Sequence, residues 1–385
     1  MRTQVAIVGA GPAGLMLAHL LRLRGVDAVV LERRSRDYVE RRVRAGVLEH
    51  PTVELLREAG VAGRLDREGM PHHGISLRFD GADHRVALTD LTGKSITVYG
   101  QQEVVKDLIA TRVGAGEPLL FEVSEVTVDP ATPLVTFTDA EGTPQRLECD
   151  FVAGCDGSHG VCAAEVRGTV QAHDYPFAWL GVLAQAPPSH SELIYAYHER
   201  GFALHSMRTP EITRLYLQVA PDERIEDWPD TRIWDELGRR LAADGFTLAT
   251  GPILEKGVTA MRSLVTEPMR QDRLFLAGDA AHIVPPTGAK GMNLAIADVW
   301  ALSEALDAYY RVGRTDLLET YSDRCLRRVW RAEHFSWWMT SMLHQAPDAD
   351  DFQRKLQLAQ LRYVATSEAA ATSLAENYVG LPFQR

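Results

Sequence analysis

A glycine-rich turn close to the start of the chain places the strongest constraint on its fold. The apolar run Gln4 to Val8 is followed at once by Gly9-Ala-Gly-Pro-Ala-Gly14, and a second apolar run, Asp27 to Leu31, ends at Glu32. Glycines at this spacing between a strand and a helix allow a tight turn and close approach of the backbone to a pyrophosphate, whose charge the helix N-terminus favours. We therefore expect a strand–helix–strand unit that binds a dinucleotide, with the acidic residue accepting hydrogen bonds from ribose hydroxyls. The residues expected to bind it are Gly9, Gly11, Gly14 and Glu32.

Length, charge and cysteine usage exclude several other classes of protein. The chain has 385 residues, enough for two or three domains at roughly 150 residues each. Its net charge of -11 argues against a general nucleic-acid binder, which normally carries a basic face. Four cysteines without a CxxC pair fit a reducing compartment, and no apolar run is long enough for a signal peptide or a membrane span. We expect a cytoplasmic protein with no metal site and no membrane partner.

The hydrophobic patterns predict two styles of β-structure. Short, fully apolar runs predict parallel strands around the nucleotide, whereas alternation at 75–99 and through most of 173–262 predicts antiparallel strands. One helix is expected near 231–244, and helices at 294–310, 317–334 and 350–378. The predicted fold is α/β (α+β), with a Rossmann-like domain interleaved with an antiparallel β-sheet substrate domain and a helical C-terminal part. The expected boundaries are 1–72, 99–172 and 263–291 for the nucleotide domain, 73–98 and 173–262 for the β domain, and 292–385 for the helical part.

Two later motifs specify the nucleotide more closely. Cys155-Asp156-Gly157 follows the apolar run 151–153, and Gly278-Asp279 ends the apolar run 274–277. An aspartate at the C-terminal end of such a strand lies where α/β folds bind ligands. The spacing alone indicates only a nucleotide site. Together with the glycine-rich turn, however, the motifs resemble those of the group A flavoprotein hydroxylases, and this resemblance implies FAD.

Further segments resemble the members of this family that hydroxylate 4-hydroxybenzoate, and they cover essentially the whole chain. The segments are Arg44–Glu49, Val98–Gln101, Glu192–Tyr195, Arg200–Leu204, Pro285–Asn293, Phe335–Ser341 and Glu376–Pro382. The resemblance implies a homodimeric FAD enzyme that converts 4-hydroxybenzoate to 3,4-dihydroxybenzoate with NADPH or NADH and O2, through a flavin C4a-hydroperoxide. The same chemistry on 4-aminobenzoate or 3,4-dihydroxybenzoate, a flavin reductase without oxygen insertion, and a regulatory flavin-binding protein are the alternatives.

An arginine is the candidate for binding the carboxylate of an aromatic acid, because guanidinium binds carboxylate bidentately. Arg208 and Ser206 lie two residues apart, so on a strand both side chains face the same side. On the residues alone, a surface arginine and a turn serine explain this pair better. The resemblance assigns Arg208, Ser206 and Tyr216 to the carboxylate, with Leu193 and Leu204 as apolar walls that ordinary core packing would explain equally well.

The hydroxylation also requires a more electron-rich ring, which means ionising the substrate phenol. A phenol has a pKa of about 10, so ionisation near pH 7 costs roughly 4 kcal/mol without help. The resemblance implies that Tyr195 and Tyr378 hydrogen-bond the phenol oxygen and relay its proton to His72. A histidine suits exchange with solvent because it titrates near neutrality.

The resemblance places the segment from Pro286 to Asn293 against the flavin ring. Gly288 and Gly291 would allow close backbone approach, Lys290 would add positive charge, and Asn293 lies at an expected helix start whose dipole favours a reduced flavin. Arg214 resembles an arginine that touches the moving flavin. The remaining predicted FAD contacts are Arg42, Arg44, Gln101, Asp156, Asp279 and Met292.

An arginine-rich segment follows Glu32 in this otherwise acidic chain and is expected to recognise phosphate. The resemblance implies that NAD(P)H contacts Arg33, Tyr38, His159 and Arg262. Ala163 stands where the resembling enzymes have an arginine, so the chain loses one phosphate partner. A strict preference for NADPH is therefore not expected, and use of both NADH and NADPH is the alternative.

Overall fold

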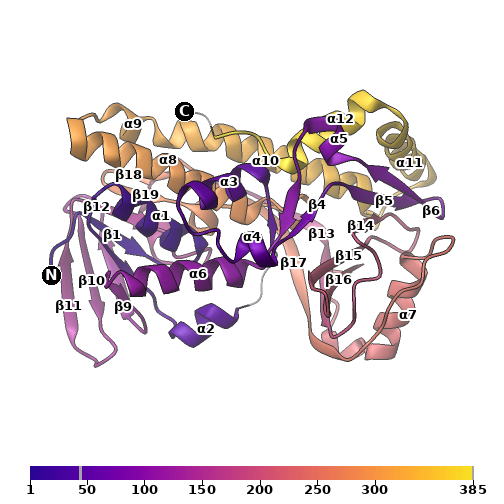
Figure 1. Cartoon of the computed structure of the whole chain (residues 1–385), viewed down its shortest axis with the longest axis horizontal. Helices are drawn as coiled ribbons and strands as arrows, with labels where there is room; N and C mark the ends of the chain where they lie inside the picture. The colour runs from indigo at the N-terminus through magenta and orange to yellow at the C-terminus, as the bar shows by residue number, and fades with distance from the viewer. Residues whose placement is uncertain (43–45, 384–385) are drawn as a thin grey trace.

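The computed structural model describes residues 1–42 and 46–383. Two units lie side by side (Figure 1). The nucleotide-type unit surrounds β1 (Val5–Val8), β12 (Phe151–Gly154) and α1 (Pro12–Leu23), and the sheet unit surrounds β13 (Thr169–Ala184) to β16 (Ile212–Val219). The long helices α8 (Gly291–Val312) and α10 (Tyr321–Leu343) run along one side of the molecule. The strands β13 (Thr169–Ala184) and β17 (Ile253–Glu267) connect the two units.

The nucleotide-type unit is built on a sheet of strand order β18-β19-β12-β1-β2-β8. All its neighbours pair in parallel except β18 with β19. The strand bounds are β1 (Val5–Val8), β2 (Ala28–Leu31), β8 (Leu119–Leu120), β12 (Phe151–Gly154), β18 (Arg270–Gln271) and β19 (Leu274–Leu276). The expected short apolar runs are therefore parallel strands, and β1, β2 and β12 are buried at every position, because both faces of this sheet are covered.

A sheet of order β20-β17-β13-β16-β15-β14-β5-β6 forms the second unit. Its pairs are antiparallel, as expected, with one exception: β14 pairs with β5 in parallel. A long connection between those two strands makes the parallel arrangement possible, whereas a hairpin would not. The strand bounds are β5 (Ile75–Phe79), β6 (Ala82–Val86), β14 (Leu193–Ala196), β15 (Ala203–Thr209), β16 (Ile212–Val219) and β20 (His282–Ile283).

The two faces of this second sheet are buried against different helices. Directly paired residues share a face, so the register puts Gly181, Tyr216, Leu204, Tyr195 and Leu77 in one row across five strands. This row faces α10, α11 (Asp351–Thr366) and α12 (Glu368–Val379), with which it shares a hydrophobic core. The opposite face packs on α7 (Asp230–Arg240). The row is where the predicted substrate residues gather.

Two smaller sheets and several short helices complete the described chain. The sheets contain β9 (Ser124–Asp129), β10 (Leu134–Thr138) and β11 (Pro144–Glu148), and β3 (Val47–Leu48), β4 (Met70–His72) and β7 (Ile96–Val98). The other helices are α1 (Pro12–Leu23), α2 (Arg36–Arg41), α3 (His50–Glu58), α4 (Leu65–Glu68), α5 (Leu88–Thr92), α6 (Gln101–Gly114) and α9 (Asp316–Glu319). Among the described residues, no helix combines the length and apolarity needed to cross a membrane.

Several boundaries differ from the sequence expectations. The alternating segment 75–99 contains the short helix α5, and α7 ends at Arg240 rather than near residue 244. The helix expected at 350–378 is two helices, because Ser367 is extended and its side chain caps α12 by accepting a hydrogen bond from the Ala370 N–H. The proposed domain boundaries at 172/173 and 262/263 fall inside β13 and β17, which pair with each other on both sides of them. The two units thus share these strands.

Candidate active site

The three glycines of the N-terminal turn have different surroundings. A Cβ on Gly9, whose φ is +106°, would lie 2.3 Å from the Cys155 carbonyl oxygen, and a Cβ on Gly14 would lie 1.9 Å from the Gly9 carbonyl oxygen. A Cβ on Gly11 would meet no atom within 4 Å. Gly9 and Gly14 are therefore required for packing, whereas Gly11 faces the open space in front of the α1 N-terminus. This is the position from which a pyrophosphate would approach the free N–H groups of that helix.

Carboxylates surround the same edge of the parallel sheet. Glu32 follows β2, and its two oxygens accept hydrogen bonds from the Ala10 N–H and the Arg34 N–H, both at 2.8 Å. Asp156 follows β12 and accepts from the Val161 and Cys162 N–H groups through Oδ2, while its buried Oδ1 has no hydrogen-bond partner. Asp279, in the turn after β19, is exposed. Glu32 thus fixes the backbone at this edge, and the unpaired Asp156 oxygen and the exposed Asp279 carboxylate could accept hydrogen bonds from the hydroxyl groups of a nucleotide.

In the turn before α8, as in the N-terminal turn, one glycine is needed for packing and another faces open space. Gly288 was expected to face the flavin, but a Cβ there would lie 2.4 Å from Ser336 Oγ, so this glycine allows the turn to pack on α10. A Cβ on Gly291 would meet nothing within 4 Å. Ala289 adopts a left-handed φ of +55°, which shapes the turn that presents the α8 N-terminus. Gly291, rather than Gly288, is the open position.

Lys290 does not add free positive charge to this turn. Its buried ammonium pairs with Glu49 Oε1 at 2.5 Å and donates to the Asn377 carbonyl. Burial lowers the pKa of Lys290 despite the neighbouring carboxylate of Glu49. The ion pair ties the turn to the start of α3 and to α12, and the role of Lys290 toward the flavin stays a prediction.

Asn293 also connects the start of α8 to the segment before α3. Its side chain accepts a hydrogen bond from the Glu49 N–H at 2.9 Å and donates to the Val47 and Ala289 carbonyls at 3.0 Å. Met292 is half-buried and packs on the core of the nucleotide-type unit. Gln101 is half-buried in the first turn of α6. Arg42 is exposed, and Arg44 lies outside the described residues. The roles of these residues toward FAD stay predictions.

The predicted carboxylate-binding residues lie together on β15 and β16. Arg208 Nη1 lies 3.5 Å from Ser206 Oγ and donates to the Met207 carbonyl at 2.8 Å, while its buried Nε has no partner. Burial lowers the pKa of Arg208, and Tyr216 lies close enough to oppose that shift. Arg208 is half-buried, and removing a guanidinium from water without a carboxylate partner is costly unless a ligand supplies one. Arg208 is therefore neither a surface residue nor fully paired within the protein.

Arg214 and Tyr216 lie on the next strand and share this face. Ser206 is paired with Arg214, and Leu204 with Tyr216. The Arg214 guanidinium lies 5.1 Å from the Tyr216 ring centre, and its buried Nη1 has no hydrogen-bond partner, only an ion pair of 3.6 Å with Glu255. The sequence analysis missed Gly181 on β13, where a Cβ would lie 2.9 Å from Arg214 Nη2. A larger residue there would require the Arg214 guanidinium to move and would crowd the Tyr216 ring.

The two predicted phenol-binding tyrosines form a buried pair. Tyr195, on β14, and Tyr378, on α12, have hydroxyl oxygens 2.5 Å apart and are 1% and 2% exposed. Burial raises the pKa of both phenols above the ordinary value, so both are neutral near pH 7. Tyr195 is paired with Leu204, which is paired with Tyr216 in the same row. Buried Leu193 and Leu204 lie on the same face and in the same core.

His72 lies at the end of β4, 2% exposed, and its Nδ1 has no hydrogen-bond partner. Burial lowers its pKa to about 4, so the imidazole is neutral near pH 7. In the described part of the chain, no hydrogen bond joins His72 directly to Tyr195 or Tyr378. A proton passing between them would need a rearrangement or a bridging water. Pro286 lies in the turn before α8, in the segment Pro286–Gly288.

Two of the predicted NAD(P)H residues are in contact. Arg33 Nη1 donates to the His159 carbonyl at 3.5 Å, and both side chains are exposed. Tyr38 is 45% exposed, and the Arg34 guanidinium lies 5.1 Å from its ring centre. Arg262 lies half-buried on β17, and Ala163 is half-buried in the turn after Asp156. The exposed arginines leave an accessible basic surface next to the dinucleotide turn.

Sequence reasoning also missed an aromatic stack behind the substrate residues. His344 lies with ring centres 4.3 Å from Phe202, 4.7 Å from Phe177 and 5.8 Å from Trp179. It accepts a hydrogen bond of 2.7 Å from Trp179 Nε1, and burial lowers its pKa to about 3. Trp179 in turn lies 4.7 Å from the Tyr216 ring. No local motif marks this stack, because its members come from three separate elements.

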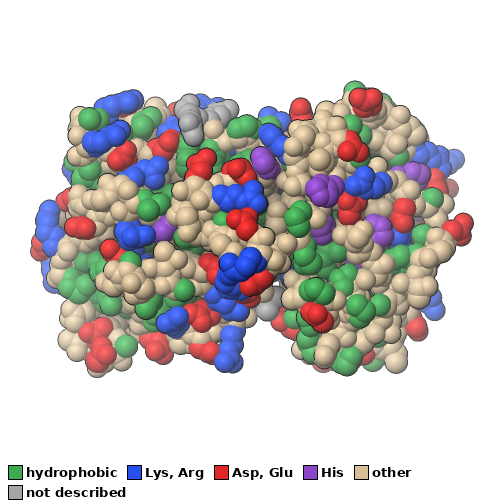
Figure 2. Space-filling view, viewed as in Figure 1, with side chains coloured by type: hydrophobic (Ala, Val, Ile, Leu, Met, Phe, Trp, Pro, Cys, Tyr) green, Lys and Arg blue, Asp and Glu red, His purple; other side chains and the backbone are tan. Residues whose placement is uncertain are grey.

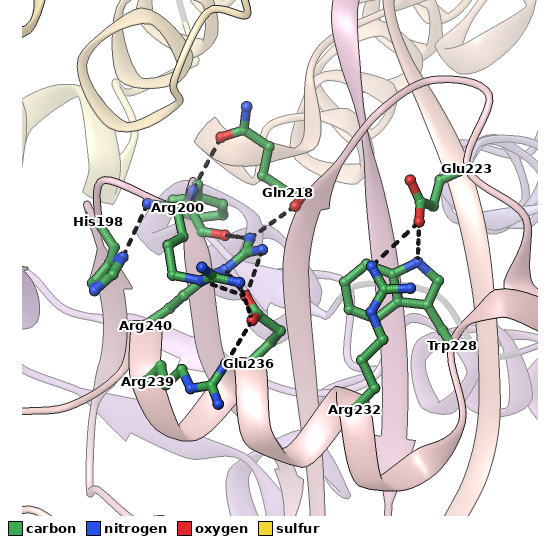
Figure 3. A network of polar contacts seen from close by, with 10 residues as sticks. His198, Arg200, Gln218, Glu223, Trp228, Arg232, Glu236, Arg239 and Arg240 are labelled. Carbon is green, nitrogen blue, oxygen red and sulfur yellow. Dashed lines mark hydrogen bonds and ion pairs between the residues drawn. The ribbon is translucent and has the colours of Figure 1, made fainter.

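A second missed group fixes the turn between β14 and β15. Glu236 on α7 lies between the guanidinium groups of Arg200, Arg239 and Arg240 (Figure 3). Arg240 Nη1 also donates to the Gln218 carbonyl at 2.8 Å. The Gln218 side chain accepts from the Phe202 and Gln345 N–H groups at 3.0 Å. This Glu236 network connects α7, the strands that carry the substrate residues and the end of α10.

Comparisons with known proteins agree with this geometry. The family described as FAD binding domain matches residues 2–336. Across 100% of its length the chain is 50% identical to p-hydroxybenzoate hydroxylase from Acinetobacter baylyi, of which 96% is covered. The crystal structure of p-nitrophenol 4-monooxygenase from Pseudomonas putida gives a TM-score of 0.84 at 20% identity, covering 98% of this chain and 99% of that one. A ternary complex of aklavinone-11 hydroxylase with FAD and aklavinone gives 0.75 at 25% identity, covering 91% and 70%.

Proposed function

The chain belongs to the FAD-binding-domain family and, within it, to the p-hydroxybenzoate hydroxylases, and from this premise we propose how its residues divide the work. The enzyme is an FAD-dependent monooxygenase that hydroxylates 4-hydroxybenzoate to 3,4-dihydroxybenzoate with NAD(P)H and O2. One observation carries the residue assignments. One sheet face carries an incompletely paired arginine, Arg208, and the buried Tyr195, whose hydroxyl bonds that of Tyr378 on the facing helix α12. These groups are complementary to the two ends of 4-hydroxybenzoate.

The residues around the dinucleotide turn fit FAD. Gly11 and Gly291 leave open space in front of the N-termini of α1 and α8. Asp156, after β12, offers a carboxylate oxygen that has no hydrogen-bond partner. Glu32 and Asp279 supply carboxylates for hydroxyl groups. When bound, FAD supplies hydride acceptance from NAD(P)H and activation of O2 for transfer to the ring. The α8 N-terminus favours the negative charge of a reduced flavin.

Arg208, Ser206 and Tyr216 would bind the substrate carboxylate. The guanidinium has an unpaired buried N–H, and a carboxylate would satisfy it with a charge-assisted hydrogen bond. Leu193 and Leu204 would hold the ring and exclude water, since both are buried on the same face. Arg214, beside Ser206, would meet the edge of the site nearest the flavin. The substrate is thereby held with its phenol group directed at the tyrosine pair.

Tyr195 and Tyr378 would assist ionisation of the phenol. The substrate hydroxyl would donate its proton toward Tyr195, the Tyr195 hydroxyl would donate toward Tyr378, and the proton would leave by way of His72. Hydrogen bonding to the phenolate favours that charged form and offsets part of the ionisation cost. Increased negative charge on the phenol oxygen activates the neighbouring ring carbon, where oxygen is inserted. Pro286 and the turn that follows it would close the site on the flavin side.

NAD(P)H would bind to the surface formed by Arg33, Tyr38, His159 and Arg262. Arg33 and His159 are in contact and exposed, which supports this location. With Ala163 in place of an arginine, discrimination between NADPH and NADH would be weak. A cytoplasmic location is part of the proposal, and the four cysteines, all free and buried, fit a reducing compartment.

The proposed enzyme acts as a homodimer. Exposed large apolar side chains on α10 and α11 support this part of the proposal, because such patches mark interaction surfaces. These side chains are Trp330, Trp337, Phe352, Leu356 and Tyr363. Light scattering of the holoenzyme would give about twice the 42.7 kDa chain mass if the proposal is right, and the single-chain mass if it is wrong.

The reaction is tested by NADPH and NADH oxidation with the purified holoenzyme, with and without 4-hydroxybenzoate, combined with product analysis. Strong stimulation with one 3,4-dihydroxybenzoate formed for each NAD(P)H consumed is the expected result. Stimulation that yields only hydrogen peroxide would mean that 4-hydroxybenzoate binds but is not the true substrate. Absence of stimulation would contradict the substrate assignment.

A further inference from the structure

The proposed proton exit ends at a histidine that has almost no contact with solvent. His72 is 2% exposed, and its Nδ1 has no partner. The titratable groups that face it are Glu192 and His190, from the segment before β14, and His73, which follows it in the chain. Figure 2 shows histidine side chains gathered near β4, β5 and β14, with basic and acidic side chains among them. A proton reaching His72 therefore has to pass through a charged environment before it reaches water.

An ion pair lies on the outer side of this environment. Arg85 on β6 binds Glu192 bidentately, with Nε–Oε2 and Nη2–Oε1 both at 2.8 Å. The Glu192 side chain is 12% exposed and the Arg85 side chain 47% exposed. The Arg85 guanidinium lies across Gly74, where a Cβ would be 2.8 Å from its central carbon. Gly74 thus allows the arginine to lie flat two residues beyond His72.

The two members of this pair act on His72 with opposite signs. The negative charge of Glu192 favours the imidazolium form, whereas a nearby positive charge disfavours it. Burial would raise the pKa of Glu192, but Arg85, with smaller effects from His72 and His190, lowers it overall. Glu192 is therefore ionised near pH 7, and Arg85, bound to it bidentately, would offset part of the field of this carboxylate at His72. Rotation of the exposed arginine away from the pair would leave Glu192 free to stabilise a proton on His72.

We propose that Arg85 and Glu192 are positioning residues for proton release, whose ion pair sets the proton affinity of His72. The inference rests on the proposed function, because it assumes that the substrate proton leaves through Tyr195, Tyr378 and His72. With the pair closed, His72 is neutral because it is buried, and Arg85 limits how far Glu192 can favour a proton on it. Opened, it exposes a carboxylate that draws the proton outward and places it within reach of solvent.

The proposal predicts opposite effects for the two halves of one ion pair. Arg85→Gln leaves Glu192 uncompensated, makes His72 a stronger base, and speeds proton release about three- to tenfold. Glu192→Gln removes the carboxylate, weakens His72 as a base, and slows release by a similar factor of about three to ten. A purely structural ion pair would give changes in the same direction, since either substitution breaks the same contact.

The experiment is a stopped-flow pH jump on the oxidised holoenzyme with bound 4-hydroxybenzoate, following phenolate absorbance without turnover. Arg362→Gln is the matched control, because Arg362 binds Asp80 at the other end of the β5–β6 hairpin, with nitrogen–oxygen distances of 2.8 and 3.1 Å. The control should match the wild type. In a His72→Asn background neither substitution should change the rate further.

Opposite changes in Arg85→Gln and Glu192→Gln that vanish with His72→Asn are the expected result. Changes of the same sign, no change, or changes that persist without His72 would overturn the proposal. Failure of the wild type to bind or ionise 4-hydroxybenzoate would instead contradict the proposed function, and this inference would fall with it. Ligand binding, measured by the shift of the flavin spectrum, distinguishes these two failures.

Discussion

The nucleotide end and the substrate end of this molecule use different parts of the chain to meet their ligands. At the nucleotide end, Gly11 and Gly291 leave open space before helix N-termini, and backbone N–H groups face that space. At the substrate end, side chains would contact the ligand: half-buried Arg208 has an unpaired N–H, and the buried Tyr195 and Tyr378 share a hydrogen bond. The first site depends on local backbone geometry and the second on strand register.

The difference has an energetic side. Backbone N–H groups at a helix start can be hydrated when no ligand is present, so the nucleotide site costs the fold little. Burying a guanidinium or two phenols away from water is expensive unless partners are supplied. The fold offsets this cost at the substrate end with the aromatic stack around His344 and the Glu236 network. Substitutions at the nucleotide end and at the substrate end should therefore differ in how much they change ligand affinity and how much they change the free energy of unfolding.

The largest effect is expected from a comparison of two glycines in the same turn. Gly14→Ala places a Cβ 1.9 Å from the Gly9 carbonyl oxygen and should destabilise the fold by about 4 kcal/mol or more. Gly11→Ala meets no atom within 4 Å, so it should leave the apoprotein stable while weakening FAD binding. Urea unfolding of the apoproteins and flavin fluorescence titration measure the two quantities. Equal loss of stability in both variants would contradict the division of roles.

At the substrate end, Arg208→Gln should weaken 4-hydroxybenzoate binding about 100-fold, equivalent to about 3 kcal/mol, because a charge-assisted contact to the carboxylate is lost. FAD affinity should not change, since Arg208 belongs to the sheet unit. The shift of the flavin spectrum on titration with 4-hydroxybenzoate gives the dissociation constant. An unchanged constant would remove Arg208 from the site.

The Glu236 network should make the sheet unit sensitive to acid. Burial would raise the pKa of Glu236, but hydrogen bonds and charge from Arg200 and Arg240 lower it from 4.5 to about 2. The network therefore contributes stability above pH 4.5 that is lost as the pH falls toward 2, up to about 3 kcal/mol. Glu236→Gln should flatten the decline in unfolding free energy between these pH values. A variant with the unaltered pH slope would show that Glu236 contributes nothing to it.

The smallest effect concerns the coenzyme. Ala163→Arg restores a cation near His159 and should raise the ratio of NADPH to NADH efficiency about three- to tenfold, as expected for one exposed phosphate contact. The kcat/KM values for the two coenzymes give the ratio directly. Ala163→Gln, which adds length without charge, is the control and should leave the ratio unchanged. A similar ratio in all three proteins would place the phosphate elsewhere.

The sequence predicted the fold of the nucleotide end, because the information for that fold is local. A strand, three spaced glycines, a helix and an acidic residue lie within about 30 residues, and the parallel sheet follows from fully apolar strands. The contacts that Gly288 and Lys290 make within the protein were not predicted. Their partners, Ser336 and Glu49, are far away in the sequence, so no local pattern could reveal those contacts.

The substrate end was predictable from the residues alone only in part. Alternation predicted the strands of the sheet but neither the parallel pairing of β14 with β5 nor the helix break at Ser367. Resemblance, rather than pattern, identified Tyr378 as a partner of Tyr195 across 183 residues. Nothing local indicated Gly181 or the His344 stack, since their importance depends on what lies on neighbouring strands.

The central claim is that a buried tyrosine pair, assembled by strand register, activates the substrate phenol. It is tested most directly by the ratio of 3,4-dihydroxybenzoate formed to NADPH consumed in Tyr195→Phe and wild-type holoenzyme. The wild type should give a ratio of about 1, and Tyr195→Phe, which keeps the ring and removes the hydroxyl, should fall to about 0.1 or below while still binding 4-hydroxybenzoate. A Tyr195→Phe enzyme that remains fully coupled would contradict the account.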